Sequence, residues 1–352
     1  MSKQAPSFVV IKPVTTALQQ NRFGRNSNDI DVQKRRKEMA KYRDQLPQLS
    51  GEVFLTDGGI ETTLIFNEGL ELPYFAAFDL LKHPAGEAAL QKYFRTYAAL
   101  ARRYGVGYIL ESATWRASAD WGAKLGYSPA TLAEMNRQAI TVLQTIRQEY
   151  EHAKTPMVIS GCIGPRGDGY NPAAFMDETE AERYHALQAA IFREADADMV
   201  TAITMTYAAE AIGITRAAQA ASMPVALSFT VETDGRLPSG QTLQEAIEQV
   251  DDATGNAPVY YMINCAHPTH FADTLVADAP WVTRIHGLRA NASTKSHAEL
   301  DAAETLDIGN PSELGRQYRA LRSKLPNLNV LGGCCGTDHH HVEEICKAFL
   351  AL

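Results

Sequence analysis

Strand and helix patterns alternate along most of this chain, and this alternation constrains the fold more than any other feature. From Glu52 onward, short apolar runs typical of strands are followed by longer stretches with helical periodicity, and about eight such units can be counted. Eight strand–helix units close a parallel barrel. We therefore expect an α/β protein with a (β/α)8 TIM barrel over residues 51–352 and an N-terminal helical extension, or arm, over residues 1–50.

The predicted elements are bounded by turn residues, and one helix carries a clear start signal in Ser128 as N-cap and Pro129 at the first helical position. A charged helix is predicted over 31–45. The predicted strands cover 53–56, 107–112, 157–160, 198–203, 224–229, 259–265, 281–285 and 329–334, and the main helices cover 85–104, 128–150, 178–196, 208–221, 242–252, 270–277, 311–325 and 342–349.

A doubly wound open sheet is the alternative fold. It would carry a glycine-rich phosphate loop after its first strand, at the start of a helix. The segment 57–59 lacks that spacing, and the glycine-rich segment 161–167 is interrupted by Pro165. The sequence therefore favours the barrel.

Charge and cysteine content narrow the classes of partner. The formal net charge is −8, which argues against nucleic acid, because phosphate binding needs a basic face. No apolar run has the length of a membrane span. Five cysteines, an odd number without framework spacing, are typical of a reducing compartment. We expect a cytoplasmic protein that acts on small molecules, with the arm available for contacts in a homo-oligomer.

The segment Gly332-Gly333-Cys334-Cys335-Gly336 predicts a metal site. It follows an apolar run, so two thiols lie on a turn at the end of a strand. Cys265 ends another predicted strand and is the best third ligand. In a barrel the C-terminal strand ends share one face. Three thiolates there suit Zn²⁺ with one coordination position open.

Other candidate ligands have simpler interpretations. Cys162, near a strand end, is expected to be a buried apolar residue rather than a fourth ligand, and Cys346 lies on the apolar face of the last helix. His339, His340 and His341 follow Thr337 or Asp338 as a helix N-cap, so we expect these histidines in an exposed first turn.

At these motifs the sequence resembles the homocysteine S-methyltransferase family, which includes betaine– and S-methylmethionine–homocysteine enzymes. The resemblance runs from about Glu52 to the C-terminus and implies a zinc-dependent (β/α)8 barrel with Cys265, Cys334 and Cys335 as zinc ligands. It is carried by Asp57-Gly58-Gly59 with Glu61-Thr62, by the segment 160–165, by Asn264-Cys265 and by the segment 332–336.

The resemblance also implies substrate contacts. Asp57 matches a carboxylate that contacts the amino group of homocysteine, and the N–H groups of Gly58 and Gly59 are expected to meet its carboxylate. Trp115 matches an aromatic residue near the substrate. Glu111, a strand-end acid, is a site residue or a salt-bridge partner at the barrel mouth, and Asn264 is a further strand-end polar residue.

The expected activity is transfer of a methyl group from a sulfonium, betaine or similar donor to a zinc-bound thiolate, with homocysteine as acceptor and methionine as product. Aromatic faces of Trp115, Trp121 and Tyr74 could attract a cationic donor. One departure leaves the acceptor open. Many family members carry a glutamate at the end of the fourth strand, but here this segment, 201–206, has no acid, and Glu210 lies in the next helix. Another thiol or selenol acceptor, or a non-catalytic zinc- or redox-sensing protein, is the alternative.

Overall fold

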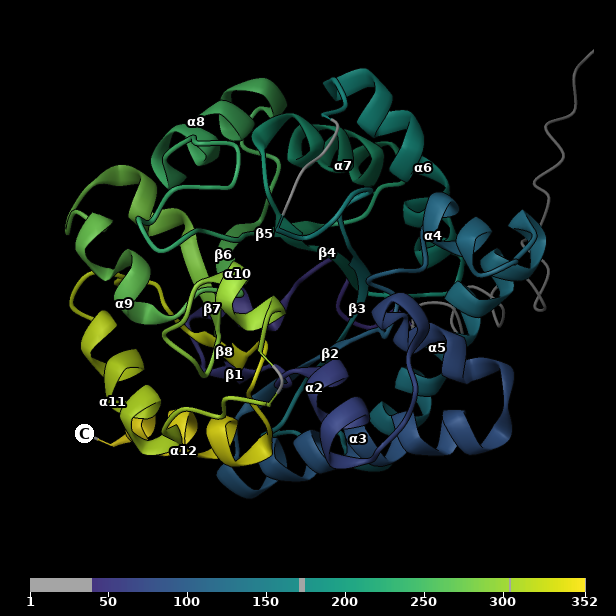
Figure 1. Ribbon diagram of the computed structural model, residues 1–352, viewed down its shortest axis with the longest axis horizontal. Helices are drawn as coiled ribbons and strands as arrows, with labels where there is room; N and C mark the ends of the chain where they lie inside the picture. The colour runs from purple at the N-terminus through teal and green to yellow at the C-terminus, as the bar shows by residue number, and fades with distance from the viewer. Residues whose placement is uncertain (1–39, 171–174, 304, 352) are drawn as a thin grey trace, which may run out of the picture.

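The computed structural model describes residues 40–170, 175–303 and 305–351. Eight parallel strands form a closed barrel in chain order, and the last strand pairs with the first (Figure 1). The predicted (β/α)8 barrel is therefore confirmed. The strands are β1 (Phe54–Leu55), β2 (Gly107–Glu111), β3 (Met157–Ile163), β4 (Met199–Met205), β5 (Val225–Phe229), β6 (Tyr260–Asn264), β7 (Ile285–Ala290) and β8 (Val330–Gly333).

Helices surround the ring of strands, and Figure 1 shows α12 beside α3, where the ring closes. The predicted start of the long α5 is confirmed, because the side chain of Ser128 accepts a hydrogen bond from Thr131 N and Pro129 begins the helix. The helices of the barrel are α2 (Ile60–Thr62), α3 (Pro84–Tyr104), α4 (Ala119–Lys124), α5 (Pro129–Tyr150), α6 (Glu178–Glu194), α7 (Ala208–Ala220), α8 (Leu243–Thr254), α9 (Pro268–Phe271), α10 (His297–Asp301), α11 (Pro311–Leu321) and α12 (His339–Leu350).

The barrel interior changes from apolar to polar along the strands. Toward the N-terminal ends of the strands, the interior is a buried apolar cluster that includes Phe54, Ile109, Met199, Tyr260 and Val330. Two residues further along several strands, the side chains on the same face are polar, because successive side chains in a strand alternate between faces. These buried polar residues are Glu111, Ser160, Thr201, Ser228, Asn264 and Arg289. The polar end of the barrel is where the strands end, and we call it the barrel mouth.

Two elements predicted between β6 and β7 were wrong in type or extent. The strand predicted over 281–285 is a 3-10 helix, Pro280–Arg284, and β7 begins only at Ile285. Gly287 and Arg289 break the apolar pattern of β7, so the apolar signal of the buried Trp281 and Val282 was assigned to the strand instead. The helix predicted over 270–277 is α9 followed by a 3-10 turn, Ala272–Thr274.

The described part of the N-terminal segment packs on the end of the barrel opposite the mouth. Leu46 belongs to the apolar cluster inside the strands, and Tyr42 N donates to Asp198 Oδ1 at 2.9 Å. The helix predicted over 31–45 lies mostly outside the described residues, and its end, residues 40–45, forms a turn. No helix in the described ranges is both long and apolar enough to cross a membrane.

Candidate active site

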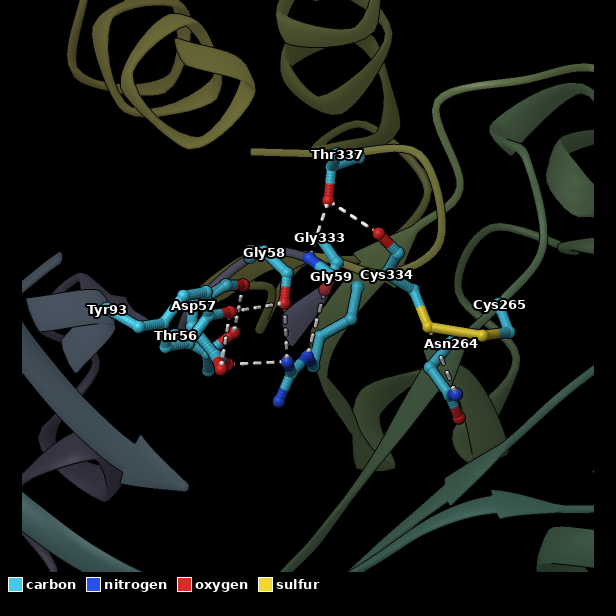
Figure 2. A network of polar contacts seen from close by, with 12 residues as sticks. Thr56, Asp57, Gly58, Gly59, Tyr93, Asn264, Cys265, Gly333, Cys334 and Thr337 are labelled. Carbon is cyan, nitrogen blue, oxygen red and sulfur yellow. Dashed lines mark hydrogen bonds and ion pairs between the residues drawn. A yellow bond between two sulfur atoms is a disulfide. The ribbon is translucent and has the colours of Figure 1, made fainter. Parts of the chain in front are cut away.

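Three cysteine side chains meet at the barrel mouth. Cys265 directly follows β6, and Cys334 and Cys335 directly follow β8. The Sγ atoms of Cys265 and Cys334 form a disulfide (Figure 2), and Cys335 Sγ lies 3.7 Å from Cys265 Sγ. All three sulfur atoms lie within 4.8 Å of one another. The structure thus brings together the three cysteines that the sequence predicted as ligands.

The spacing of these sulfur atoms suits a metal ion once the disulfide is reduced. Two thiolates about 2.3 Å from a tetrahedral Zn²⁺ lie about 3.8 Å apart, close to the spacing of Cys335 and Cys265. Metal binding requires thiolates, so the disulfide between Cys265 and Cys334 and metal coordination exclude each other.

Glycines allow the turn after β8 to lie close to β1. A Cβ atom at Gly332 would collide with Thr56 Oγ1, and one at Gly333 would collide with Thr337 Oγ1. Thr337 Oγ1 donates to Cys334 O at 2.7 Å. The turn is therefore held by its own hydrogen bond, which places Cys334 and Cys335 over the barrel.

Asn264 supports the neighbouring strand end. Its Oδ1 accepts hydrogen bonds from Thr204 N at 3.0 Å and from Ser228 Oγ at 2.6 Å, and its Nδ2 donates to Thr204 Oγ1 at 2.9 Å. Thr204 has a left-handed backbone, with φ of 67°, which costs energy in a β-branched residue. These bonds offset that cost, while Asn264 Nδ2 also lies 3.9 Å from Cys334 Sγ.

Two residues beside the cysteines were missed by the sequence analysis. The hydroxyl of Tyr170 lies 3.3 Å from Cys335 Sγ and 3.6 Å from Cys265 Sγ. Its ring stacks on His297 with centroids 4.0 Å apart, and His297 contacts Cys265 O through Nε2 at 2.5 Å. Tyr170 lies in the loop after β3, and His297 begins the short α10 after β7, so neither belongs to a segment long enough for sequence periodicity to indicate its position.

Asp57 forms a buried ion pair. Its Oδ1 lies 2.5 Å from Arg289 Nη2, and its Oδ2 accepts a hydrogen bond from the Tyr93 hydroxyl at 2.9 Å. Only 2% of Asp57 is exposed. The carboxylate that the resemblance assigns to the amino group of homocysteine is thus bound to Arg289, a residue that the sequence analysis did not place in the site.

The glycines after Asp57 are also partly engaged. Gly59 N donates to Thr337 O at 3.1 Å and lies 3.2 Å from Thr337 Oγ1. Gly58 O accepts from the Tyr93 hydroxyl at 3.0 Å. The Gly59 N–H that was expected to meet a substrate carboxylate therefore has a partner within the chain.

Two glutamates lie near this ion pair. Burial raises the pKa of Glu111, at the end of β2, to about 7, against the opposing effect of Arg289. Burial also raises the pKa of Glu61 to about 7, and Asp57 adds to the rise. Glu111 is 4% exposed, whereas Glu61 is only half-buried. Because both pKa values lie near 7, each carboxyl group gains or loses its charge near neutral pH. This change alters the electrostatic potential at the barrel mouth.

The aromatic faces proposed for a cationic donor already carry cations of this chain. The guanidinium carbon of Arg116 lies 4.0 Å from the ring centre of Trp115 and 3.9 Å from that of Trp121. Lys124 Nζ lies 3.9 Å from the Trp121 ring, and Tyr74 packs beside that ring at 6.0 Å. A cationic donor would compete with these side chains.

The end of β4 carries a hydroxyl and no acid. Thr206 is buried, and its Oγ1 has no hydrogen-bond partner among the described residues. Glu210, in α7, is bonded to His185 Nε2 at 3.0 Å and to Arg166 N at 2.7 Å. Glu210 thus serves a buried network outside the cysteine centre.

The remaining candidates behave mostly as expected. Cys162 and Cys346 are buried free thiols. Asp338 caps α12, and His339 and His340 lie in its exposed first turn. The expectation was wrong for His341, which is 2% exposed, because its Nε2 bonds to Ile308 O at 2.8 Å.

Comparisons with known proteins agree with this arrangement. The family model described as homocysteine S-methyltransferase matches residues 54–349. Crystal structures of the homocysteine methyltransferase MmuM from Escherichia coli are similar in fold. The metallated form has a TM-score of 0.64 at 16% identity over 85% of this chain and 97% of that one. The oxidised form has a TM-score of 0.63 at 16% identity, over 84% and 95%. No curated protein sequence matches this chain.

A closed parallel barrel with three cysteines at its mouth defines a barrel enzyme built for chemistry at a thiol-rich centre. The family match covers nearly the whole barrel. The chain belongs to the homocysteine S-methyltransferase family and is a methyltransferase. The structural likeness to MmuM, at its low identity, shows the fold.

Proposed function

We propose that the protein is a zinc-dependent S-methyltransferase that methylates homocysteine to methionine. The observation that carries the proposal is the set of three sulfur atoms, of Cys265, Cys334 and Cys335, within 4.8 Å at the mouth of a barrel of this family. The metallated form of MmuM supports a metal in the same fold. Zn²⁺, when bound, keeps a coordinated thiol deprotonated at neutral pH.

The chain's own residues would hold and shield the acceptor. The three cysteine thiolates supply the ligands, and Asn264 fixes the strand end beside Cys265 through its bonds to Thr204 and Ser228. Tyr170, above Cys335 and Cys265, covers the sulfur atoms from solvent. Excluding water strengthens the electrostatic interactions of the reacting groups.

The remaining predicted substrate contacts also lie at this mouth. They belong to the ends of β1, β2 and β6 and the loops that follow. We propose that they shape the pocket, either directly or by positioning charged neighbours. These residues are Asp57, Gly58, Gly59, Glu111, Trp115 and Asn264.

The proposed donor carries its methyl group on a sulfonium or quaternary ammonium centre, as in S-methylmethionine or a betaine. Such a donor leaves as a neutral molecule, so no general acid is needed. The donor and the acceptor thiolate must lie about 3–3.5 Å apart, in line for attack. Trp115 and Trp121 would attract the cationic donor only if the guanidinium of Arg116 moved away from their ring faces.

One observation favours a second candidate, a thiol or selenol without the amine of homocysteine. Asp57 is paired with Arg289, and the end of β4 has Thr206 rather than an acid. Calorimetric titration of reduced, zinc-loaded protein with L-homocysteine tests the choice. Zinc-dependent micromolar binding with proton release supports homocysteine. Absence of binding, while other thiols bind and are methylated, supports the second candidate, and binding without methyl transfer from any donor would indicate a zinc-dependent sensor.

We also propose a cytoplasmic location and a homo-oligomer whose contacts involve residues 1–50, which lie ahead of the barrel domain of residues 51–352. The reducing environment follows from the need for three thiolates. Gel filtration of the full chain and of a chain without residues 1–39, which keeps the segment that packs on the barrel, tests the oligomer.

A further inference from the structure

Two of the head-group contacts expected from the sequence, the Asp57 carboxylate and the Gly59 N–H, are used within the chain. Both oxygens of the Asp57 carboxylate have partners, Arg289 and Tyr93, and Gly59 N donates to Thr337. Thr206, at the end of β4, carries no charge. An amino acid that enters this mouth therefore needs partners beyond Asp57 and the Gly59 N–H for its ammonium group and its carboxylate.

Arg289 and Glu111 each have, inside the barrel mouth, one buried charged-group atom without a hydrogen-bond partner among the described residues. Arg289 donates through Nε to Gly333 O at 3.2 Å and through Nη2 to Asp57 and Gly58, but its Nη1 has no acceptor. The hydroxyls of Ser160 and Thr201 act to lower the pKa of Glu111, but Glu111 Oε2 has no hydrogen-bond donor among the described residues. Arg289 is 6% exposed and Glu111 is 4% exposed. Leaving such groups unpaired is costly, so they are expected to have a ligand or water as partner.

These two side chains act on each other without touching. Burial by itself would lower the pKa of Arg289, but the carboxylates of Asp57 and Glu111 outweigh burial and raise it. Among the described residues, the direct ion pair of Arg289 is with Asp57 and not with Glu111. Arg289 and Glu111 therefore place a cation and a carboxyl group near each other inside the barrel mouth, each with one unpartnered atom.

Arg289 is also tied to both cysteine-bearing turns. Its carbonyl oxygen accepts from Cys265 N at 3.1 Å, and its Nε binds the carbonyl of Gly333, the residue before Cys334. A ligand group held by Nη1 is thus placed beside the strands that carry the sulfur atoms.

We propose that Arg289 Nη1 binds the carboxylate of the acceptor amino acid and Glu111 Oε2 binds its ammonium group. This inference rests on the proposed function and assigns recognition of the zwitterionic head to β7 and β2, in place of an acid at the end of β4. Both residues are specificity-determining, and neither takes part in methyl transfer.

Three thiols that differ only in the head test the proposal. They are L-homocysteine, 3-mercaptopropylamine, which lacks the carboxylate, and 4-mercaptobutanoate, which lacks the amine. Each is titrated calorimetrically into reduced, zinc-loaded protein. A charged hydrogen bond in a buried site makes the wild-type protein bind each analogue about 10- to 100-fold more weakly than homocysteine.

The variants separate the two contacts. In Glu111→Gln, the dissociation constants of homocysteine and 4-mercaptobutanoate should lie within about twofold of each other. The weaker binding of 3-mercaptopropylamine relative to homocysteine should persist. In Arg289→Lys, which keeps a cation beside Asp57, the loss for 3-mercaptopropylamine should disappear instead. Glu61→Gln is the matched control, since Glu61 is another acid of the mouth with a raised pKa, and it should keep both losses.

Several outcomes overturn the proposal. If homocysteine binds but both analogues still bind more weakly than homocysteine in the two variants, Arg289 Nη1 and Glu111 Oε2 hold only ordered water. If Glu61→Gln, rather than Glu111→Gln, removes the preference for the amine, the ammonium contact belongs to Glu61. If none of the three thiols binds to correctly folded wild-type protein in a zinc-dependent manner, the proposed function fails, and this inference fails with it. Circular dichroism of each variant checks the fold.

Discussion

Arg289 Nη2 lies 2.5 Å from Asp57 Oδ1 inside the barrel, although the two residues are 232 positions apart in the chain. The pair joins β7 to the end of β1 and neutralises the carboxylate that the family resemblance assigns to substrate. A buried ion pair contributes little net stability when intact, but loss of one partner leaves an uncompensated charge.

The first prediction concerns this pair. Arg289→Met leaves the Asp57 carboxylate buried without its cation, so the free energy of unfolding should fall by about 3–5 kcal/mol. Denaturant unfolding measures the change. The double variant Asp57→Asn with Arg289→Met removes both charges and should regain part of the loss. Equal stability of the single and double variants would show that the pair is not electrostatically coupled.

The second prediction concerns the cysteines. Cys265→Ala, Cys334→Ala and Cys335→Ala should each lose bound zinc and methyl transfer, because each removes one of three ligands. Metal content by atomic emission and transfer from a sulfonium donor measure the two effects. Cys346→Ala, on the buried face of α12, is the control and should keep its zinc. Any of the three variants with full zinc and turnover would exclude that cysteine from the site.

The third prediction links metal, redox state and stability. Zinc that binds only the folded chain at 100 times its dissociation constant should raise the free energy of unfolding by about 2.7 kcal/mol. The gain should appear with reductant and be absent when Cys265 and Cys334 form their disulfide, which removes two ligands. Thermal unfolding with zinc, with and without reductant, measures this. Equal zinc stabilisation in both states would place the metal elsewhere.

The fourth prediction is a pH dependence from Glu111. Burial raises its folded-state pKa from 4.5 to about 7, so the folded chain holds the proton more tightly than the unfolded chain. Its stabilising contribution is present below about pH 4.5 and is lost as the pH rises through about 7. The loss is on the order of 3 kcal/mol. Glu111→Gln should therefore be more stable than the ligand-free wild-type protein at pH 8 and lose this advantage at pH 5.

Thermal unfolding of both proteins at the two pH values measures the difference. A stability difference that stays constant from pH 5 to pH 8 would contradict the assignment of the titration to Glu111.

Much of the architecture was predictable because local patterns repeat. Alternation of apolar runs and helical periodicity indicated the barrel, and the C-terminal strand ends brought Cys265, Cys334 and Cys335 to one face. The extent of β7 was missed, since Gly287 and Arg289 occupy positions where an apolar residue would have marked a strand. In the sequence alone, a polar residue that points into a barrel cannot be told from a loop residue.

The sequence by itself determined the fold class, the family and the meeting of Cys265, Cys334 and Cys335 on one face, because strand order in a closed parallel barrel follows the chain and places each strand end at the mouth. Only the tertiary structure decided which charges meet there. Asp57 with Arg289, Tyr170 over Cys335, and the unpartnered atoms of Glu111 and Arg289 depend on side chains from strands and loops far apart in sequence. Their contacts follow from barrel closure, which no local pattern encodes.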